Sequence, residues 1–200
     1  MKKKIISCLV IIVVIVLSYF YAHIDKNSYI YNRHTENADF ISTGILNDGE
    51  ELVQTFRAEE DAIDGINVKV SVPNNSENVV LHYEVVDVKA NKVVSSKISA
   101  SKLDNNKFNL LKVPRIEDTK GKSFAIVLKV ECDDESQGLA FYLEPGRQNN
   151  NELDVKGNST DATLIARSVC HRFDVETFVV LLGMITFIVG FMKVLYKFFK

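Results

Sequence analysis

The feature that most constrains this chain is an unbroken apolar run near its N-terminus, from Ile5 to Ala22, without a charged residue. An α-helix rises about 1.5 Å per residue, so a run of this length can cross the roughly 30 Å hydrocarbon layer of a bilayer. The run is longer than the apolar part of an ordinary signal peptide, and Phe20-Tyr21-Ala22 is a poor cleavage site. The sequence favours a retained transmembrane helix over residues 5–22, with cleavage as the alternative.

A second apolar run extends from Phe178 to Met192. It becomes long enough to span a bilayer if Lys193 extends its side chain toward the lipid headgroups, which predicts a second transmembrane helix over residues 175–196. Small residues share one face of this helix, namely Gly183, Thr186 and Gly190. They either allow another helix to approach closely or reflect the ordinary frequency of glycine in membrane helices.

The charges divide the chain into three parts. All 26 acidic residues lie between Asp25 and Glu176, whereas six of the 24 basic residues lie in the two ends, so the ends carry +6 and the middle −8. Basic residues collect on the cytoplasmic side of membrane spans. We therefore expect a two-pass protein of the plasma membrane, with cytoplasmic tails at residues 1–4 and 197–200 and an extracytoplasmic middle. A nucleic-acid partner would need a basic patch and is not expected.

The middle of the chain predicts a stalk followed by a β domain. Residues 23–51 are polar and rich in Asn, as in a stalk. From residue 52 to residue 173, short alternating segments such as Ile66–Val72 are separated by turns, one of them at Ala90-Asn91-Lys92. A single open sheet would leave an apolar face in water, so we expect an all-β domain of two packed antiparallel sheets, a jelly-roll-like β-sandwich flanked by two single transmembrane helices.

Motifs for catalysis are sparse. The chain lacks the HExxH, GxSxG, GxGxxG and CxxC patterns, so no catalytic residue and no organic cofactor is expected. Acidic residues cluster at Asp133, Asp134 and Glu135, where carboxylates could bind calcium or simply form a solvated turn. There is no Trp, and Tyr83 and Tyr142 fall in apolar patterns typical of a core.

Two cysteines, Cys132 and Cys170, lie in the part expected outside the cell, where a disulfide would persist. They form either one disulfide or two buried thiols, and the sequence does not distinguish the two arrangements.

Several segments occur in an order that is familiar from one group of proteins. Gln54-x-Phe56 lies in a first strand, Gly65-Ile66-x-Val68 in a second, and Asp118–Lys122 forms a later Asp-x-Lys-Gly-Lys turn. Over about Glu51 to Cys132, this resembles the jelly-roll ectodomains of bacterial membrane proteins from cell-envelope polysaccharide systems. The resemblance implies a carbohydrate-binding-module-like sandwich and transfers no catalytic residue.

Three functional hypotheses follow. The favoured one is a non-enzymatic, double-anchored accessory of cell-envelope polysaccharide assembly, whose partners are the lipid bilayer and either an envelope glycan or another membrane protein. The second is a small membrane-bound enzyme or processing factor that uses an acidic site such as Asp133 or Glu135. The third is a membrane subunit that acts mainly through the helix face containing Gly183 and Gly190.

Overall fold

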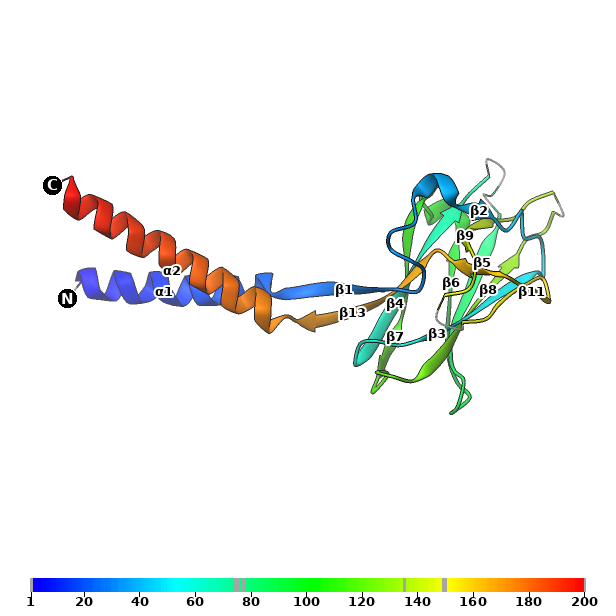
Figure 1. Ribbon diagram of the computed structural model, residues 1–200, viewed down its shortest axis with the longest axis horizontal. Helices are drawn as coiled ribbons and strands as arrows, with labels where there is room; N and C mark the ends of the chain where they lie inside the picture. Colours follow the sequence, from blue (N-terminus) through cyan, green and yellow to red (C-terminus); the bar gives the residue numbers. More distant parts are fainter. Residues whose placement is uncertain (1, 74–75, 77, 135, 149–150, 200) are drawn as a thin grey trace. The chain divides into compact units, whose positions relative to one another are not determined.

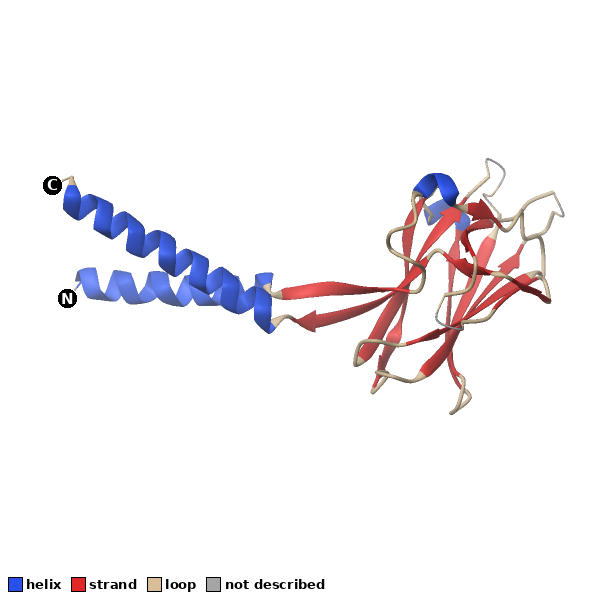
Figure 2. Cartoon of the chain, in the orientation of Figure 1, coloured by secondary structure: helices blue, strands red, loops and turns tan. Residues whose placement is uncertain are grey.

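The computed structural model describes residues 2–73, 76, 78–134, 136–148 and 151–199, and for residues 2–8 it describes the backbone. Contacts divide the chain into two units, one formed by residues 1–26 and 171–200 and the other by residues 27–170. The first unit contains the helices α1 (Lys2–Tyr21) and α2 (Val175–Phe198), and the second contains most of the strands (Figure 2). The expected order of helix, strands and helix is therefore present.

One sheet has the strand order β1-β13-β4-β9-β12, with β7 beside β4 and β2 beside β9 (Figure 1). Its strands are β1 (His23–Tyr29), β2 (Ile41–Ser42), β4 (Ala62–Ser71), β7 (Lys107–Glu117), β9 (Ala140–Pro145), β12 (Ala162–Leu164) and β13 (Ala166–Phe173). In β4, Ile66, Val68 and Val70 are buried, as their alternation predicts. Because neighbouring residues of a strand point to opposite faces, Asn67 and Lys69 lie on the outer face of this sheet.

The other sheet has the order β11-β10-β3-β8-β5-β6. Its strands are β3 (Glu51–Arg57), β5 (Val80–Asp87), β6 (Lys92–Ser99), β8 (Ser123–Glu131), β10 (Leu153–Val155) and β11 (Asn158–Thr160). The expected hairpin turn is confirmed, since Asp87 pairs with Lys92 and Asn91 adopts a φ of 50°. Two short 3-10 helices lie outside the sheets, η1 (Asn37–Asp39) and η2 (Ala100–Lys102).

The two sheets share one apolar core. Phe124, Leu128 and Leu81 come from the second sheet, Ile66 and Phe141 come from the first, and each is at most 1% exposed. Burying a large apolar side chain contributes about 1.5–3 kcal/mol relative to leaving it in water. The sandwich-like core explains why the strands alternate so regularly, and the expectation of antiparallel strands in two sheets is confirmed.

Residues 23–51, expected as a polar stalk, instead contribute to the sheets and the core. This segment contains β1 and β2, and Leu46 is fully buried and forms a β-bridge with Leu139. The neighbouring Gly138 is required here, because a Cβ atom at that position would lie 2.1 Å from the Leu46 carbonyl oxygen. Packing therefore begins before residue 52. The sequence did not indicate this packing, because the buried residues of the segment are isolated rather than alternating.

The helical unit joins the end of α1 to the start of α2. The backbone N–H of Asp174 donates to the carbonyl of Ala22 over 2.8 Å. Aromatic rings gather at this junction, where Phe173 lies 5.4 Å from Tyr19 and 5.3 Å from Phe178, measured between ring centroids. Among the described residues, α2 is long and apolar enough to cross a membrane, and the apolar segment Leu9–Tyr21 of α1 is shorter.

Candidate functional site

The two cysteines are free thiols in the structure and form no disulfide. The Sγ atom of Cys132 contacts the Gln137 carbonyl oxygen at 3.5 Å, and its backbone N–H donates to Asp48 Oδ1 at 3.0 Å. Cys170 is 3% exposed, and burial raises the pKa of both thiols. Of the two arrangements that the sequence left open, the structure contains the pair of buried thiols.

Two members of the acidic cluster have different environments, since Asp133 lies at a pocket and Asp134 lies in a turn. Asp133 lines a pocket of about 540 Å³ together with Asp48, Glu50 and other polar residues. Asp134 Oδ1 instead accepts the Ser136 N–H at 2.8 Å, which lowers the pKa of the Asp134 carboxyl. Glu135 lies outside the described residues. Within the described part of the chain, no group of three or more acidic, His or Cys side chains is arranged to bind a metal, so calcium stays a prediction.

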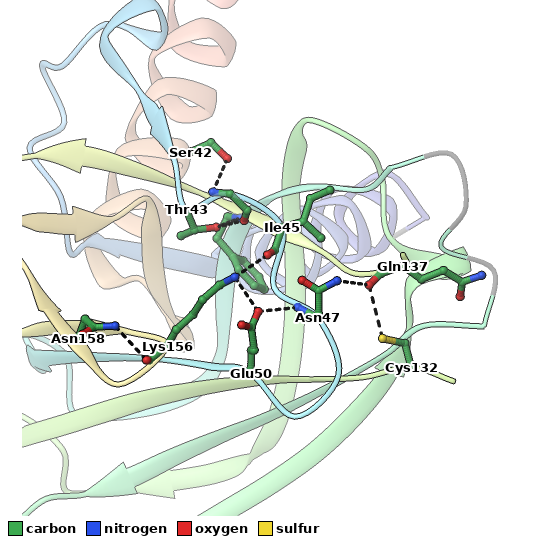
Figure 3. A network of polar contacts seen from close by, with 11 residues as sticks. Ser42, Thr43, Ile45, Asn47, Glu50, Cys132, Gln137, Lys156 and Asn158 are labelled. Atoms are coloured by element: carbon green, nitrogen blue, oxygen red, sulfur yellow. Dashed lines mark hydrogen bonds and ion pairs between the residues drawn. The ribbon is translucent and has the colours of Figure 1, made fainter. Parts of the chain in front are cut away.

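A polar network beside this pocket holds the loop between β2 and β3 (Figure 3). Lys156 Nζ lies 2.7 Å from Glu50 Oε2 and also donates to the Ile45 carbonyl at 2.9 Å. Glu50 Oε2 accepts the Asn47 N–H at 2.8 Å, and Asn47 Nδ2 donates to the Gln137 carbonyl at 3.1 Å. The hydrogen bond from Lys156, with that from Asn47, lowers the pKa of Glu50. The polar groups of this network form hydrogen bonds with one another, so the network stabilises the loop.

The small-residue face of α2 is open in the described structure. A Cβ atom added at Gly183 or Gly190 would meet no atom within 4 Å. Thr186 Oγ1 donates to the Leu182 carbonyl of its own helix at 2.7 Å. Contact of this face with another helix therefore stays a prediction.

A second pocket, of about 540 Å³, lies where β1, β13, the end of β3 and the turn between β7 and β8 meet. The turn is held to β3 because Gly121 N donates to the Ala58 carbonyl at 2.7 Å and Arg57 Nε donates to the Gly121 carbonyl at 3.1 Å. Gly121 has a φ of +76°, a conformation that favours glycine. Two motifs that the sequence analysis singled out, the Gln54-x-Phe56 strand and the Asp118–Lys122 turn, thus come together at one pocket.

The lining of this pocket combines charged, hydroxyl and apolar groups, including Ser28, Phe56, Arg57, Glu59, Lys120 and Ser168. Ser28 is 6% exposed, and its Oγ atom has no hydrogen-bond partner among the described residues. A recess lined by apolar side chains together with a few polar groups is the usual form of a small-molecule site. This pocket, here called the β3-end pocket, is the candidate binding site.

Gln54 is a buried polar residue that the sequence analysis did not single out as structural. It is fully buried, its Oε1 accepts the Leu164 N–H at 2.8 Å, and its Nε2 donates to the Glu152 carbonyl at 3.1 Å. Since Gln54 is on β3 and Leu164 is on β12, one side chain connects the two sheets. Its inward position between Leu52 and Phe56 was the available signal.

The two tyrosines interpreted as core residues have different environments. Tyr83 is 6% exposed and its hydroxyl donates to the Lys112 carbonyl at 2.9 Å, so that interpretation is confirmed. Tyr142 is half-buried, and the Lys69 Nζ lies 4.9 Å from its ring centroid. Tyr142 is therefore on the outer face of the first sheet, because Phe141 and Leu143 take the inward positions.

Comparison with known proteins does not assign the chain to a family. No protein family model and no curated protein matches the chain. Among solved structures, the crystal structure of the infectious bursal disease virus VP2 subviral particle aligns with 74% of this chain and 38% of its own, at 11% identity and a TM-score of 0.23. The chain spans well under half of that protein, and a likeness this low says nothing about what the chain binds.

Proposed function

We propose that this protein is a double-anchored, non-enzymatic accessory of cell-envelope polysaccharide assembly. Both helices would cross the plasma membrane with the termini in the cytoplasm. The β unit would be an extracytoplasmic, jelly-roll-like sandwich that binds an envelope glycan or a neighbouring membrane protein. Among the described residues, no observation favours the alternative of an acidic-site enzyme, because Glu50 and Asp48 beside Asp133 already bond to Lys156 and Cys132.

The observation that carries this proposal is the junction of the two helices. The hydrogen bond between Asp174 and Ala22 holds the last turn of α1 beside the first turn of α2. Two helices that meet at one end and both enter a bilayer must place their free ends on the same side. Those free ends carry all six basic residues that lie outside the acidic middle, which fits a cytoplasmic location for both termini.

The surroundings of the junction also suit a membrane surface. Tyr19, His23 and Phe173 form one ring cluster, with the His23 and Phe173 centroids 5.3 Å apart. Aromatic side chains with a polar edge prefer the headgroup layer, where one part of the ring is dry and the other wet. The β3-end pocket is the proposed binding site, since its Arg57, Glu59 and Lys120 offer hydrogen-bond donors and an acceptor to sugar hydroxyls.

A labelling experiment tests the membrane arrangement. In a chain with Cys8→Ser, Cys132→Ala and Cys170→Ala, a single new cysteine is introduced as Lys89→Cys in the exposed β5–β6 turn or as Lys200→Cys at the end. A membrane-impermeant maleimide added to intact cells should label the first variant, and should label the second only after the cells are opened. Labelling of position 200 in intact cells overturns the proposed orientation.

Crosslinking in the native membrane tests the binding half. The full-length protein should recover either glycan or a specific membrane protein, and Arg57→Gln with Lys120→Gln should reduce that recovery because both side chains line the β3-end pocket. Lys97→Gln, on the exposed edge strand β6, is the matched control. Recovery of neither partner from correctly oriented protein would reject an accessory binding role.

A further inference from the structure

The outer face of the first sheet holds an arginine against aromatic rings. The Cζ atom of Arg167 lies 3.8 Å from the ring centroid of Phe108 and 4.6 Å from that of Tyr29. One terminal nitrogen, Nη2, donates to the Tyr31 hydroxyl at 3.2 Å. Arg167 is on β13, and its contacts come from β7, β1 and the segment after β1, so three other parts of the chain hold one guanidinium.

A lysine and a second arginine also lie against aromatic rings close to Arg167. Lys69 Nζ lies 4.9 Å from the ring centroids of both Phe40 and Tyr142 and donates to Asn37 Oδ1 at 3.1 Å. The exposed Arg33 places its Cζ 5.9 Å from the Tyr29 centroid. Lys69 and Phe108 are direct neighbours across β4 and β7, and Tyr31 stacks on Phe108 at 6.4 Å. The resulting surface is here called the cation–aromatic face: Arg33, Lys69 and Arg167 with Tyr29, Tyr31, Phe40, Phe108 and Tyr142.

The cations of this face have no acidic partner in the described residues. None of the three takes part in an ion pair, although four other lysine or arginine side chains do. The buried carboxylate of Glu144, on the same sheet, accepts instead from the Asn32 N–H at 2.9 Å and from the Thr35 hydroxyl. The Nε atom of Arg167 is buried without a hydrogen-bond partner among the described residues. Lys69 and Arg167 are half-buried cations without an acidic partner among the described residues, an arrangement that attracts an anion from outside the chain.

We infer that the cation–aromatic face binds an anionic glycan, whose carboxylate or phosphate groups pair with Arg33, Lys69 and Arg167. This inference rests on the proposed function and specifies its ligand class. The cations select negative charge, and the half-buried rings of Tyr29, Phe40 and Tyr142 offer apolar surface to the C–H groups of sugar rings. The nearby Glu36 and Asp39 form no ion pair with these cations, so the cations stay available to the ligand within the described structure.

Binding to the full-length protein in phosphatidylcholine nanodiscs tests the inference. The probes are polygalacturonate, which carries carboxylates, poly(glycerol phosphate), which carries phosphates, neutral dextran and the acidic polypeptide poly-glutamate. At least one of the first two should bind more tightly than dextran and poly-glutamate, and salt should weaken that binding. Arg33→Gln and Lys69→Gln should each weaken it by about two- to five-fold, the effect of removing one partly exposed ion pair.

Matched variants and the other probes separate the outcomes. Lys97→Gln removes an exposed lysine from β6 in the other sheet and should leave the affinity unchanged. Arg167→Lys keeps the charge but loses the planar group between the rings, so it should weaken binding while the circular dichroism spectrum stays the same.

Dextran binding as tightly as the anionic probes overturns the inference and leaves glycan binding as a function. Poly-glutamate binding equally tightly overturns the inference in favour of an acidic peptide ligand. Failure of polygalacturonate, poly(glycerol phosphate) and dextran alike to bind rejects both the inference and the glycan-binding role.

Discussion

Gln54 is the residue on which the connection between the sheets depends most directly. Its side chain is fully buried among apolar neighbours, and its Oε1 atom accepts the hydrogen bond of the Leu164 N–H. The Glu152 carbonyl, by contrast, also accepts the Thr55 N–H at 2.8 Å and would keep a partner without Gln54. Replacement by an apolar residue of similar size therefore leaves one buried donor unsatisfied.

Gln54→Leu should lower the free energy of unfolding by about 1–3 kcal/mol, the cost of one buried unsatisfied backbone group. Thermal unfolding of the full-length protein, followed by the β-sheet circular dichroism signal, measures this change. Ser95→Ala, at an exposed position of β6, is the control and should stay within about 0.5 kcal/mol. Equal stability of Gln54→Leu and the parent chain would show that the hydrogen bond contributes nothing.

The Glu50–Lys156 pair gives a pH dependence with a defined sign. The folded-state pKa of Glu50 lies below the ordinary value of 4.5, so the folded protein binds a proton at this site less readily than the unfolded chain. The pair therefore stabilises the fold above pH 4.5, and this contribution is lost as the pH falls through the lower folded pKa.

Lys156→Met should lower the melting temperature at pH 7, and the difference from the parent chain should shrink as the pH falls below 4.5. Methionine keeps an unbranched side chain at a position where φ is 55°, so the backbone is equally strained in both proteins. Lys102→Met, at an exposed lysine of η2, provides the comparison. A difference that does not change with pH would mean that Lys156 stabilises the fold through packing rather than charge.

At the scale of elements, the loop before β3 is held to the first sheet by close backbone contact. Leu46 bonds to Leu139 in both directions, with N···O distances of 2.7 and 3.1 Å. Gly138 allows this approach because it has no Cβ atom. The loop is thus an integral part of the β unit.

Gly138→Ala should destabilise the β unit by about 1–3 kcal/mol, since the added methyl group collides with backbone that has little room to move. Gly183→Ala is the matched control, because a Cβ atom there meets nothing within 4 Å. Hydrogen exchange at the amides of Leu46 and Leu139 should become faster in the Gly138 variant and unchanged in the control. Unaltered exchange in both variants would contradict a tight junction at Leu46.

The elements that could be predicted from the sequence are those with strict alternation. In β3 and β5, buried residues alternate with more exposed ones, so the sequence period reveals the strand. The segment from residue 30 to residue 46 has isolated buried residues, Ile30, Tyr31 and Leu46, whose partners are distant in sequence. No local pattern can reveal such packing. The same limit applies to the cation–aromatic face, because Arg167 and Phe108 are brought together only when β13 and β7 flank β4.

At the scale of the whole chain, the order of helix, β unit and helix could be predicted from composition and charge. Whether Cys132 and Cys170 form a disulfide could not be decided from the sequence, because two cysteines show that pairing is allowed and not that their side chains meet. The β3-end pocket was also beyond prediction in position, although both motifs that form it were recognised as separate segments.

The neighbouring position of β1 and β13 in the first sheet has a mechanical consequence. In the sequence, β1 follows α1 and β13 precedes α2, so the chain connects the β unit to both helices. A polymer that binds and pulls on this unit would therefore transmit force through two covalent connections instead of one.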